Sequence, residues 1–215
     1  TRIYDGWLQV TDGDVYAEGA IANFIPPSCT GTCKARFLLD GQGGDPGVLQ
    51  YGGSGYDFGS GQVSSQGWVV NSAYDGKRYG FEFWRTHLDL ATAAPSDWSG
   101  AQLADAQKPA GTPANGGNAY YADGNMTIAN GTWQVASGEK IVVLVKGNVT
   151  IQARTSVADG GFLAIIASGD ISVDAAVNSE DGVAGIEGIY IADGSFSTGS
   201  GNQKLIIEGT VVGWQ

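Results

Sequence analysis

The chain has 215 residues, of which 35 are glycine, and only 15% of its residues are charged. Glycine destabilises a helix interior by ~1 kcal/mol relative to alanine, so this composition excludes a helical bundle. The formal net charge of −11 excludes a basic nucleic-acid-binding protein, because neutralising phosphates needs clustered Lys and Arg, while an apolar fraction of 42% is enough to build a core.

Residues 1–84 are predicted to form an N-terminal β region that carries a cysteine-containing insertion. The strand-like stretch W-L-Q-V-T ends at Asp12-Gly13, and a further glycine-marked copy surrounds Gly61. The repeat register is poor here, and Asp-Gly is also a signal for hairpin turns. An antiparallel β-sandwich therefore stays open as the alternative for this half of the chain.

The insertion at residues 23–55 holds the candidate crosslink and the candidate metal ligands. Cys29 and Cys33 are spaced C-T-G-T-C, and zinc would need two further Cys or His ligands in a chain with one histidine. We therefore predict a disulfide, which favours an oxidising, extracellular setting. Asp40 and Asp45, in D-G-Q-G-G-D, are candidate calcium ligands, and no other metal or cofactor is expected.

Residues 85–118 are predicted to be a connector that packs on the strands. Short helices are expected over Thr86–Ala93 and Ser96–Ala106. His87 is the only histidine that could act as the base of a hydrolase, but no G-x-S-x-G motif is present, and Y-G-G-S-G-Y around Ser54 fails it by one place. We interpret His87 as a connector residue and predict no catalytic residue.

Residues 119–215 contain a repeat of about 22 residues. Its motif reads G-N-M-T-I, G-N-V-T-I and G-D-I-S-V, with a looser copy at Gly194 and a short one at Gly209. Apolar and hydroxyl residues alternate with the period of two that half-buried strands require. We therefore predict one continuous all-β unit, a parallel β-solenoid with coils of about 22 residues, in which Met126, Val149 and Ile171 form an internal file.

One column of the predicted outer face is apolar. Leu144 and the other residues three positions before each glycine are expected to face inward, so the residues four positions before it should face solvent. These outer residues are the candidates for an assembly face: Val143, Ile165, Tyr190 and Leu205. Either the connector or the 23–55 insertion covers this column, or a partner subunit does.

Other polar motifs have a structural interpretation beside the functional one. Asp170 and Asp193 lie beside glycine, where Asp caps its own backbone, so paired glycosidase carboxylates are not needed to explain them. The N-x-T patterns at Asn125, Asn130 and Asn148 match glycosylation acceptors, but the repeat also demands Asn at its turn. Exposed Trp or Tyr could stack on sugar rings, so a carbohydrate-binding or polysaccharide-cleaving solenoid is the alternative function.

The segments L-A-I-I-A-S-G-D-I-S-V and G-I-E-G-I-Y-I-A-D-G-S-F-S-T-G, together with W-L-Q-V-T-D-G-D-V, resemble uncharacterised secreted surface proteins of uncultivated bacteria, some of them pilus-associated. The resemblance covers about half of the chain and implies a parallel β-helix displayed outside the cell. It carries no catalytic residues over to this sequence.

The chain ends on V-V-G-W-Q, within a repeat, so an open terminal coil with unpaired backbone groups is expected. No apolar run approaches the ~20 residues of a membrane span, and a start at Thr1 indicates a processed N terminus. The predicted function is that of a non-enzymatic, extracellular structural or adhesive protein. Its partners would be further copies or a neighbouring subunit of a surface appendage or filament, with a glycan as a further ligand.

Overall fold

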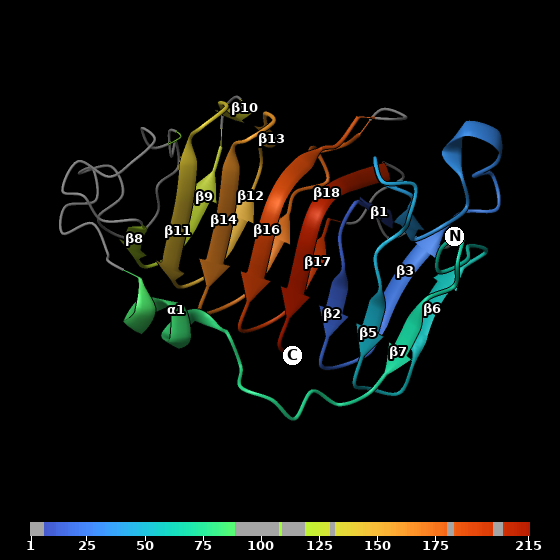
Figure 1. Ribbon diagram of the computed structural model, residues 1–215, viewed down its shortest axis with the longest axis horizontal. Helices are drawn as coiled ribbons and strands as arrows, with labels where there is room; N and C mark the ends of the chain where they lie inside the picture. The colour runs from blue at the N-terminus through green and yellow to red at the C-terminus, as the bar shows by residue number, and fades with distance from the viewer. Residues whose placement is uncertain (1–6, 89–107, 109–118, 130–131, 180–182, 200–203) are drawn as a thin grey trace.

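Figure 1 shows the computed structural model, which describes residues 7–88, 108, 119–129, 132–179, 183–199 and 204–215. Strands dominate these residues, which also hold one α-helix and the short turn η1 (Gly31–Cys33). The strand pairings between them are parallel in both halves of the chain. The prediction of an all-β chain with parallel strands is confirmed, and the antiparallel alternative for residues 1–84 is wrong.

The largest sheet has ten strands, eight of which follow one another in the order β7-β5-β2-β18-β16-β14-β11-β8. Their bounds are β2 (Val15–Ala17), β5 (Leu49–Tyr51), β7 (Val69–Asn71), β8 (Tyr120–Asp123), β11 (Lys140–Lys146), β14 (Phe162–Ala167), β16 (Ile186–Ala192) and β18 (Lys204–Gly213). Strand β1 (Trp7–Thr11) pairs with the first half of β18, and β4 (Leu38–Leu39) pairs with β1.

Shorter strands form separate small sheets behind the large one (Figure 1). The first is β17-β15-β12-β9, made of β9 (Met126–Ile128), β12 (Val149–Ile151), β15 (Ile171–Val173) and β17 (Phe196–Thr198). The second joins β3 (Ile21–Ile25) to β6 (Tyr56–Gly59), and the third joins β10 (Thr132–Val135) to β13 (Arg154–Val157). The described strands therefore belong to several parallel sheets.

The glycine-marked repeats lie in the register that their sequence predicts. Val149 pairs with Met126 on one side and with Ile171 on the other, and Ile171 pairs with Phe196. Met126, Val149 and Ile171 are at most 1% exposed, so they form the internal file that the repeat predicts. The hydroxyl column is also in register, because Thr150 lies between Thr127 and Ser172.

The assembly-face candidates lie in the core, which contradicts their predicted position on the outside. Val143, Ile165 and Tyr190 have no exposed surface, and Leu205 is 3% exposed. All four pack in the main apolar cluster with Val149 and its neighbours. Inward and outward side chains alternate without interruption through each motif glycine, so the residues four positions before it and two positions after it face the same side. The prediction required this alternation to shift by one residue at the glycine.

In each strand, the residue that faces outward from the large sheet follows directly after the buried assembly-face candidate. Leu144, Ile166 and Ile191 form a second apolar cluster with Phe81 and Trp214. Residues 72–88, here called the strap, run from β7 to β11 along the lower ends of the large-sheet strands (Figure 1). The strap includes α1 (Phe81–His87), so residues of the chain itself cover the outer apolar column.

The predicted connector is described only at its beginning. Helix α1 begins at Phe81, five residues before the predicted start at Thr86, and ends at His87. The rest of Thr86–Ala93 beyond Leu88, and all of Ser96–Ala106, lie outside the described residues. Asp193 accepts a hydrogen bond from the Phe81 amide at 3.0 Å, so a side chain from the β16–β17 turn anchors the first turn of α1.

The last strand lies in the middle of the large sheet, between β16 and the N-terminal strands. β18 pairs with β16 along one edge and with β1 and then β2 along the other. The expectation of an unpaired terminal coil is therefore wrong for this strand. The pairing also unites residues 7–71 and 119–215 in one sheet, although the two regions are far apart along the chain.

A second file of glycines, which the repeat motif does not contain, marks the bend between the two halves of β18. Gly188 pairs with Gly209 on the neighbouring strand. Gly13 and Gly47 continue the file, because a Cβ on Gly13 would collide with the Gly209 carbonyl and a Cβ on Gly47 would collide with the Gly13 carbonyl. Gly13 therefore stacks on Gly209, and the predicted alignment of Gly13 and Gly209 with Gly194 is wrong.

Candidate assembly interface

The exposed large apolar side chains gather at one end of the large sheet and on the strap. Of the seven such residues in the described part of the chain, five lie between residues 56 and 79. They are Tyr56, Trp68, Val70, Tyr74 and Tyr79. Trp68 is 44% exposed and directly precedes β7, which ends the described sheet at this side.

Among the described strands, none pairs with the outer edge of β7. The Leu49 amide donates to the Trp68 carbonyl at 3.1 Å, and the Ser72 amide donates to the Tyr51 carbonyl at 3.2 Å. Because amide direction alternates along a strand, the N–H groups of Val69 and Asn71 point away from β5. An edge of this kind is a template for another strand, and few charges protect it.

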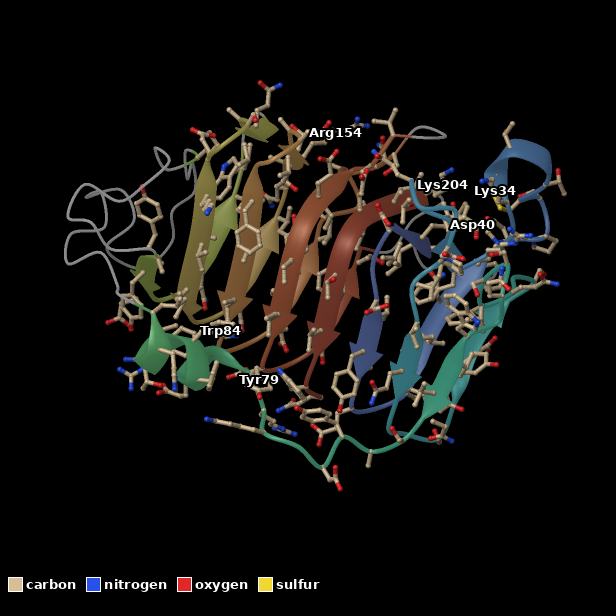
Figure 2. The ribbon with its side chains drawn as sticks, viewed as in Figure 1. Lys34, Asp40, Tyr79, Trp84, Arg154 and Lys204 are labelled. Carbon is tan, nitrogen blue, oxygen red and sulfur yellow. A yellow bond between two sulfur atoms is a disulfide. The ribbon has the colours of Figure 1, made fainter. Side chains whose placement is uncertain are left out.

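The strap carries further aromatic side chains between β7 and β11. Figure 2 labels Tyr79 and Trp84, and the Trp84 indole nitrogen donates to the Tyr79 carbonyl at 2.8 Å. The Tyr74 ring packs edge-on against Tyr16 and at a tilt against Trp214. These contacts fix its position, and 37% of its surface remains exposed. These rings could contact a protein surface or the face of a sugar.

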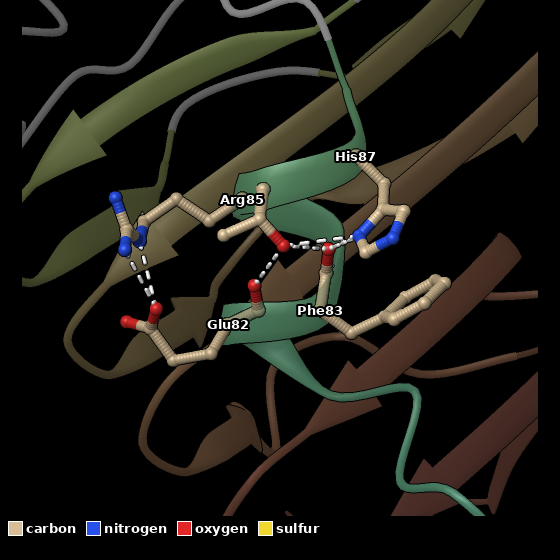
Figure 3. Close-up of polar contacts among 5 residues, drawn as sticks. Glu82, Phe83, Arg85 and His87 are labelled. Atoms are coloured by element: carbon tan, nitrogen blue, oxygen red, sulfur yellow. Dashed lines mark hydrogen bonds and ion pairs between the residues drawn. The ribbon is translucent and has the colours of Figure 1, made fainter.

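His87 has no catalytic surroundings among the described residues. Its Nδ1 lies 2.7 Å from the Phe83 carbonyl and 3.0 Å from the Thr86 hydroxyl, at the end of α1 (Figure 3). Its ring also stacks on the Phe83 ring, with 4.1 Å between centroids. These contacts are those of a residue on the surface of a helix.

Cys29 and Cys33 form the predicted disulfide, with their Cα atoms 5.2 Å apart. Asp40 accepts a hydrogen bond from Ser65 and pairs with Arg36 at 3.5 Å, and it is labelled in Figure 2. The Asp45 carbonyl accepts from the Gly41 amide. Within the described residues no three acidic, histidine or cysteine side chains gather as a metal site would require, so calcium binding by Asp40 and Asp45 gains no support here.

At the turns, an asparagine or aspartate side chain of one repeat accepts a hydrogen bond from a backbone amide of the next repeat. Asn125 accepts from the Asn148 amide at 2.9 Å, Asn148 accepts from the Asp170 amide at 2.9 Å, and Asp170 accepts from the Ser195 amide at 2.8 Å. These contacts favour the turn interpretation of Asn125, Asn148 and Asp170 over glycosylation or catalysis. Asn130 lies outside the described residues.

Tyr190 and Gln9 are buried polar side chains that the sequence does not predict. Tyr190 is fully buried and its hydroxyl lies 2.7 Å from the Thr155 hydroxyl and 3.0 Å from the Glu187 carbonyl, and burial raises its pKa. Gln9 has no exposed surface and donates to the carbonyls of Lys34 and Arg36. No local sequence signal separates these residues from solvent-facing ones, because both lie in ordinary alternating strands.

Acidic side chains gather where β16 and β18 are paired. Glu187 and Glu208 lie opposite each other on adjacent strands. Although Glu208 is exposed, partial desolvation by its neighbours raises its pKa, and the charges of Glu187, Asp12 and Asp159 raise it further. The charged form of Glu208 therefore costs folding free energy above the raised pKa and costs none below the unfolded value of about 4.5.

We expect Glu208→Gln to raise the melting temperature at pH 7 because it removes this charge. The gain should shrink as the pH falls through the folded pKa of Glu208, since the wild-type carboxyl is then protonated in the folded state. Melting temperatures of both proteins at pH 7 and pH 4 test this expectation. A gain of equal size at both pH values would contradict it.

No helix in the described residues is long and apolar enough to cross a membrane. Comparison with known protein families, curated proteins and solved structures finds no match to this chain.

Proposed function

We propose that this chain is a non-enzymatic structural protein of the cell exterior, which winds as a parallel β-solenoid and assembles with neighbouring subunits. The observation that carries the proposal is the outward-facing edge of β7, which ends a parallel sheet beside exposed aromatic side chains. At the other end of the same described sheet lies β8. Because all strands run in one direction, β7 of one copy and β8 of the next could continue the sheet head to tail.

Further features support the extracellular location. The Cys29–Cys33 disulfide is typical of proteins in oxidising compartments. The resemblance of the glycine-marked segments to secreted bacterial surface proteins points the same way. Val143, Ile165, Tyr190 and Leu205 are buried and offer no assembly face, so the proposed contact is at the end of the sheet.

The edge contact is tested with a pair of substitutions at Asn71, whose amide points away from β5. Asn71→Pro removes that donor and is expected to weaken association by roughly fivefold, since a hydrogen bond contributes about 1 kcal/mol. Asn71→Ala keeps the amide and should associate like the wild type. Sedimentation velocity over a wide concentration range measures both.

Proline is tolerated on edge strands, so the melting temperature of Asn71→Pro should stay close to that of the wild type. A wild-type protein that stays monomeric at every concentration, without a partner, would overturn self-assembly. Equal association of the proline and alanine variants would place the contact elsewhere than at β7.

Carbohydrate binding is the second candidate, and the exposed rings of Tyr56, Trp68 and Tyr79 favour it. Several carboxylates near the C-terminal strands accept backbone hydrogen bonds within their own or a neighbouring repeat, among them Asp170, Asp174 and Glu187. Asp193 accepts a hydrogen bond from the strap. A glycan array with wild type and Trp68→Ala tests binding, and a hit that survives the substitution would exclude Trp68 as the contact.

A further inference from the structure

A cavity lies on one face of the paired strands β1 and β18. Gln9 pairs with Ile206, and Thr11 pairs with Glu208. Because side chains alternate along a strand, all four point to the same side of the sheet. Val10 points to the other side, where it belongs to the main apolar cluster. The cavity on the side of Gln9 has a volume of about 210 Å³ and is here called the Gln9 pocket.

The disulfide loop forms one wall of the Gln9 pocket. The Gln9 side-chain nitrogen donates to the carbonyls of Lys34 and Arg36, each at 2.7 Å, and to that of Cys33 at 3.3 Å. These bonds and the Cys29–Cys33 disulfide hold the loop against β1. Lys34 lines the pocket and has a φ of 50°, which residues other than glycine rarely adopt. Strained backbone of this kind occurs preferentially at ligand-binding sites.

The oxygen of the Gln9 amide is the feature that points to a ligand. Gln9 has no exposed surface, and among the described residues no group donates a hydrogen bond to its Oε1 atom. The orientation of the amide is fixed, because reversing it would direct the oxygen at the carbonyls that accept from the nitrogen. A buried acceptor without a donor costs folding free energy. Since Gln9 lines the pocket, a bound molecule with a donor group would satisfy Oε1.

The charges around the pocket favour an anionic group on that molecule. Figure 2 labels Lys34, Asp40 and Lys204, which come from three separate segments and line the same pocket. Asp40 pairs with Arg36 at 3.5 Å, so its charge is compensated, and Glu208 is the second carboxylate of the lining. None of the ion pairs between described residues includes Lys34. Its ammonium group is therefore available to a carboxylate of a ligand.

The donor that reaches Gln9 is a hydroxyl group and not an ammonium group. Burying an ammonium against one neutral amide oxygen would leave most of its charge without a partner, and Lys34 and Lys204 would repel it. A hydroxyl group donates to Oε1 without that cost. The Thr11 hydroxyl offers a further polar partner, and Leu39 offers an apolar contact. The lining is therefore complementary to a small carboxylate that carries hydroxyl groups on a carbon frame.

We propose that the Gln9 pocket binds a hydroxylated carboxylic acid of the size of one uronic acid ring. Its carboxylate pairs with Lys34 at the exposed edge of the pocket, and one ring hydroxyl donates to Gln9 Oε1. The pocket is smaller than the ~300–1,000 Å³ of sites for drug-sized ligands, which restricts the bound part to a single ring. Free uronic acids and the residues of acidic glycans share this chemistry. The site is separate from the edge of β7 and stands whether or not that edge assembles.

Matched probes separate the two halves of this recognition. D-glucuronate and D-galacturonate carry both the carboxylate and the hydroxyl groups. D-glucose and D-galactose lack the carboxylate, and cyclohexanecarboxylate lacks the hydroxyl groups. NMR titration of the isotope-labelled chain, followed at the side-chain amide of Gln9, measures each dissociation constant. At least one uronate is expected to bind at least fivefold more tightly than its neutral sugar and than cyclohexanecarboxylate.

Lys34→Gln is expected to weaken uronate binding about fivefold, since an exposed ion pair contributes up to about 1 kcal/mol and every 1.4 kcal/mol is about tenfold. Lys140→Gln is the matched control, because Lys140 is also an exposed lysine and does not line the pocket. It removes the same charge from the chain and should bind like the wild type. Both variants should keep the melting temperature of the wild type, since surface substitutions of this kind change stability little.

Four results would overturn the proposal. The first is no shift of the Gln9 amide with either uronate, which would assign the pocket to water alone. The second is equal affinity for the uronates and either class of matched probe. The third is equal affinity of the Lys34→Gln and Lys140→Gln variants. The fourth is tighter binding of free serine than of both uronates, which would assign the pocket to an amino acid.

An oligogalacturonate distinguishes the two sources of a uronic acid. Tighter binding of the oligomer than of free D-galacturonate would identify the ligand as a residue of an acidic glycan, whereas equal or weaker binding would identify it as the free acid. Either result supports the pocket chemistry. The β7 edge is measured separately by sedimentation of Asn71→Pro, so failure of one proposal does not imply failure of the other.

Discussion

Gly209→Ala is expected to lower the free energy of unfolding by about 3 kcal/mol, because it combines backbone strain with a steric collision. Gly209 has a φ of 136°, a conformation that L-amino acids rarely adopt, and a Cβ there would strike the Gly188 carbonyl oxygen. The file of stacked glycines has no free space into which the added methyl group could move. Urea unfolding of the variant, followed by tryptophan fluorescence, measures the loss.

Gly43→Ala is the matched control for this prediction. A Cβ at Gly43 would meet no atom within 4 Å, and its φ is not in the left-handed region. Its free energy of unfolding should therefore stay within about 0.5 kcal/mol of the wild type. Equal losses for Gly209→Ala and Gly43→Ala would show that close approach along the Gly188–Gly209 file does not contribute to stability.

Phe81→Ala is expected to cost about 3 kcal/mol, the second large effect. Phe81 is 1% exposed and packs with Leu144, Ile166 and Ile191, so its removal leaves a cavity between the strap and the large sheet. The loss should also release the first turn of α1, whose amide at Phe81 is held by Asp193. Urea unfolding gives the cost, and limited proteolysis of the folded protein reports on the strap.

Phe83→Ala serves as the comparison, since Phe83 belongs to the same helix but is only half-buried and contacts Tyr79 and His87. Its replacement should cost about 1 kcal/mol. Faster cleavage within residues 72–88 is expected for Phe81→Ala alone. If both variants lose the same stability, the strap would be held by its surface contacts and not by insertion of Phe81.

The glycine-marked repeat is the part of the fold that the sequence reveals best. Its strands lie in the predicted register, because identical spacing and period-two alternation act between adjacent repeats and leave few other pairings that bury Val149 and Ile171. The disulfide was predictable for a similar reason, since four residues of separation leave Cys29 and Cys33 close together in space. The edge of β7 carries no comparable local signal.

The sequence by itself determined that the chain is all-β, that its strands are parallel in the repeat, and which residues form the file of Met126, Val149 and Ile171. These properties depend on neighbouring repeats, so local periodicity encodes them. Only the tertiary structure decided which face of β14 is internal, because F-L-A-I-I-A is apolar on both faces and the packing of Phe81 makes the second face buried as well. The insertion of β18 between β16 and β1 was likewise decided in three dimensions, because that pairing joins residues about 200 positions apart and depends on backbone edges that every sequence shares.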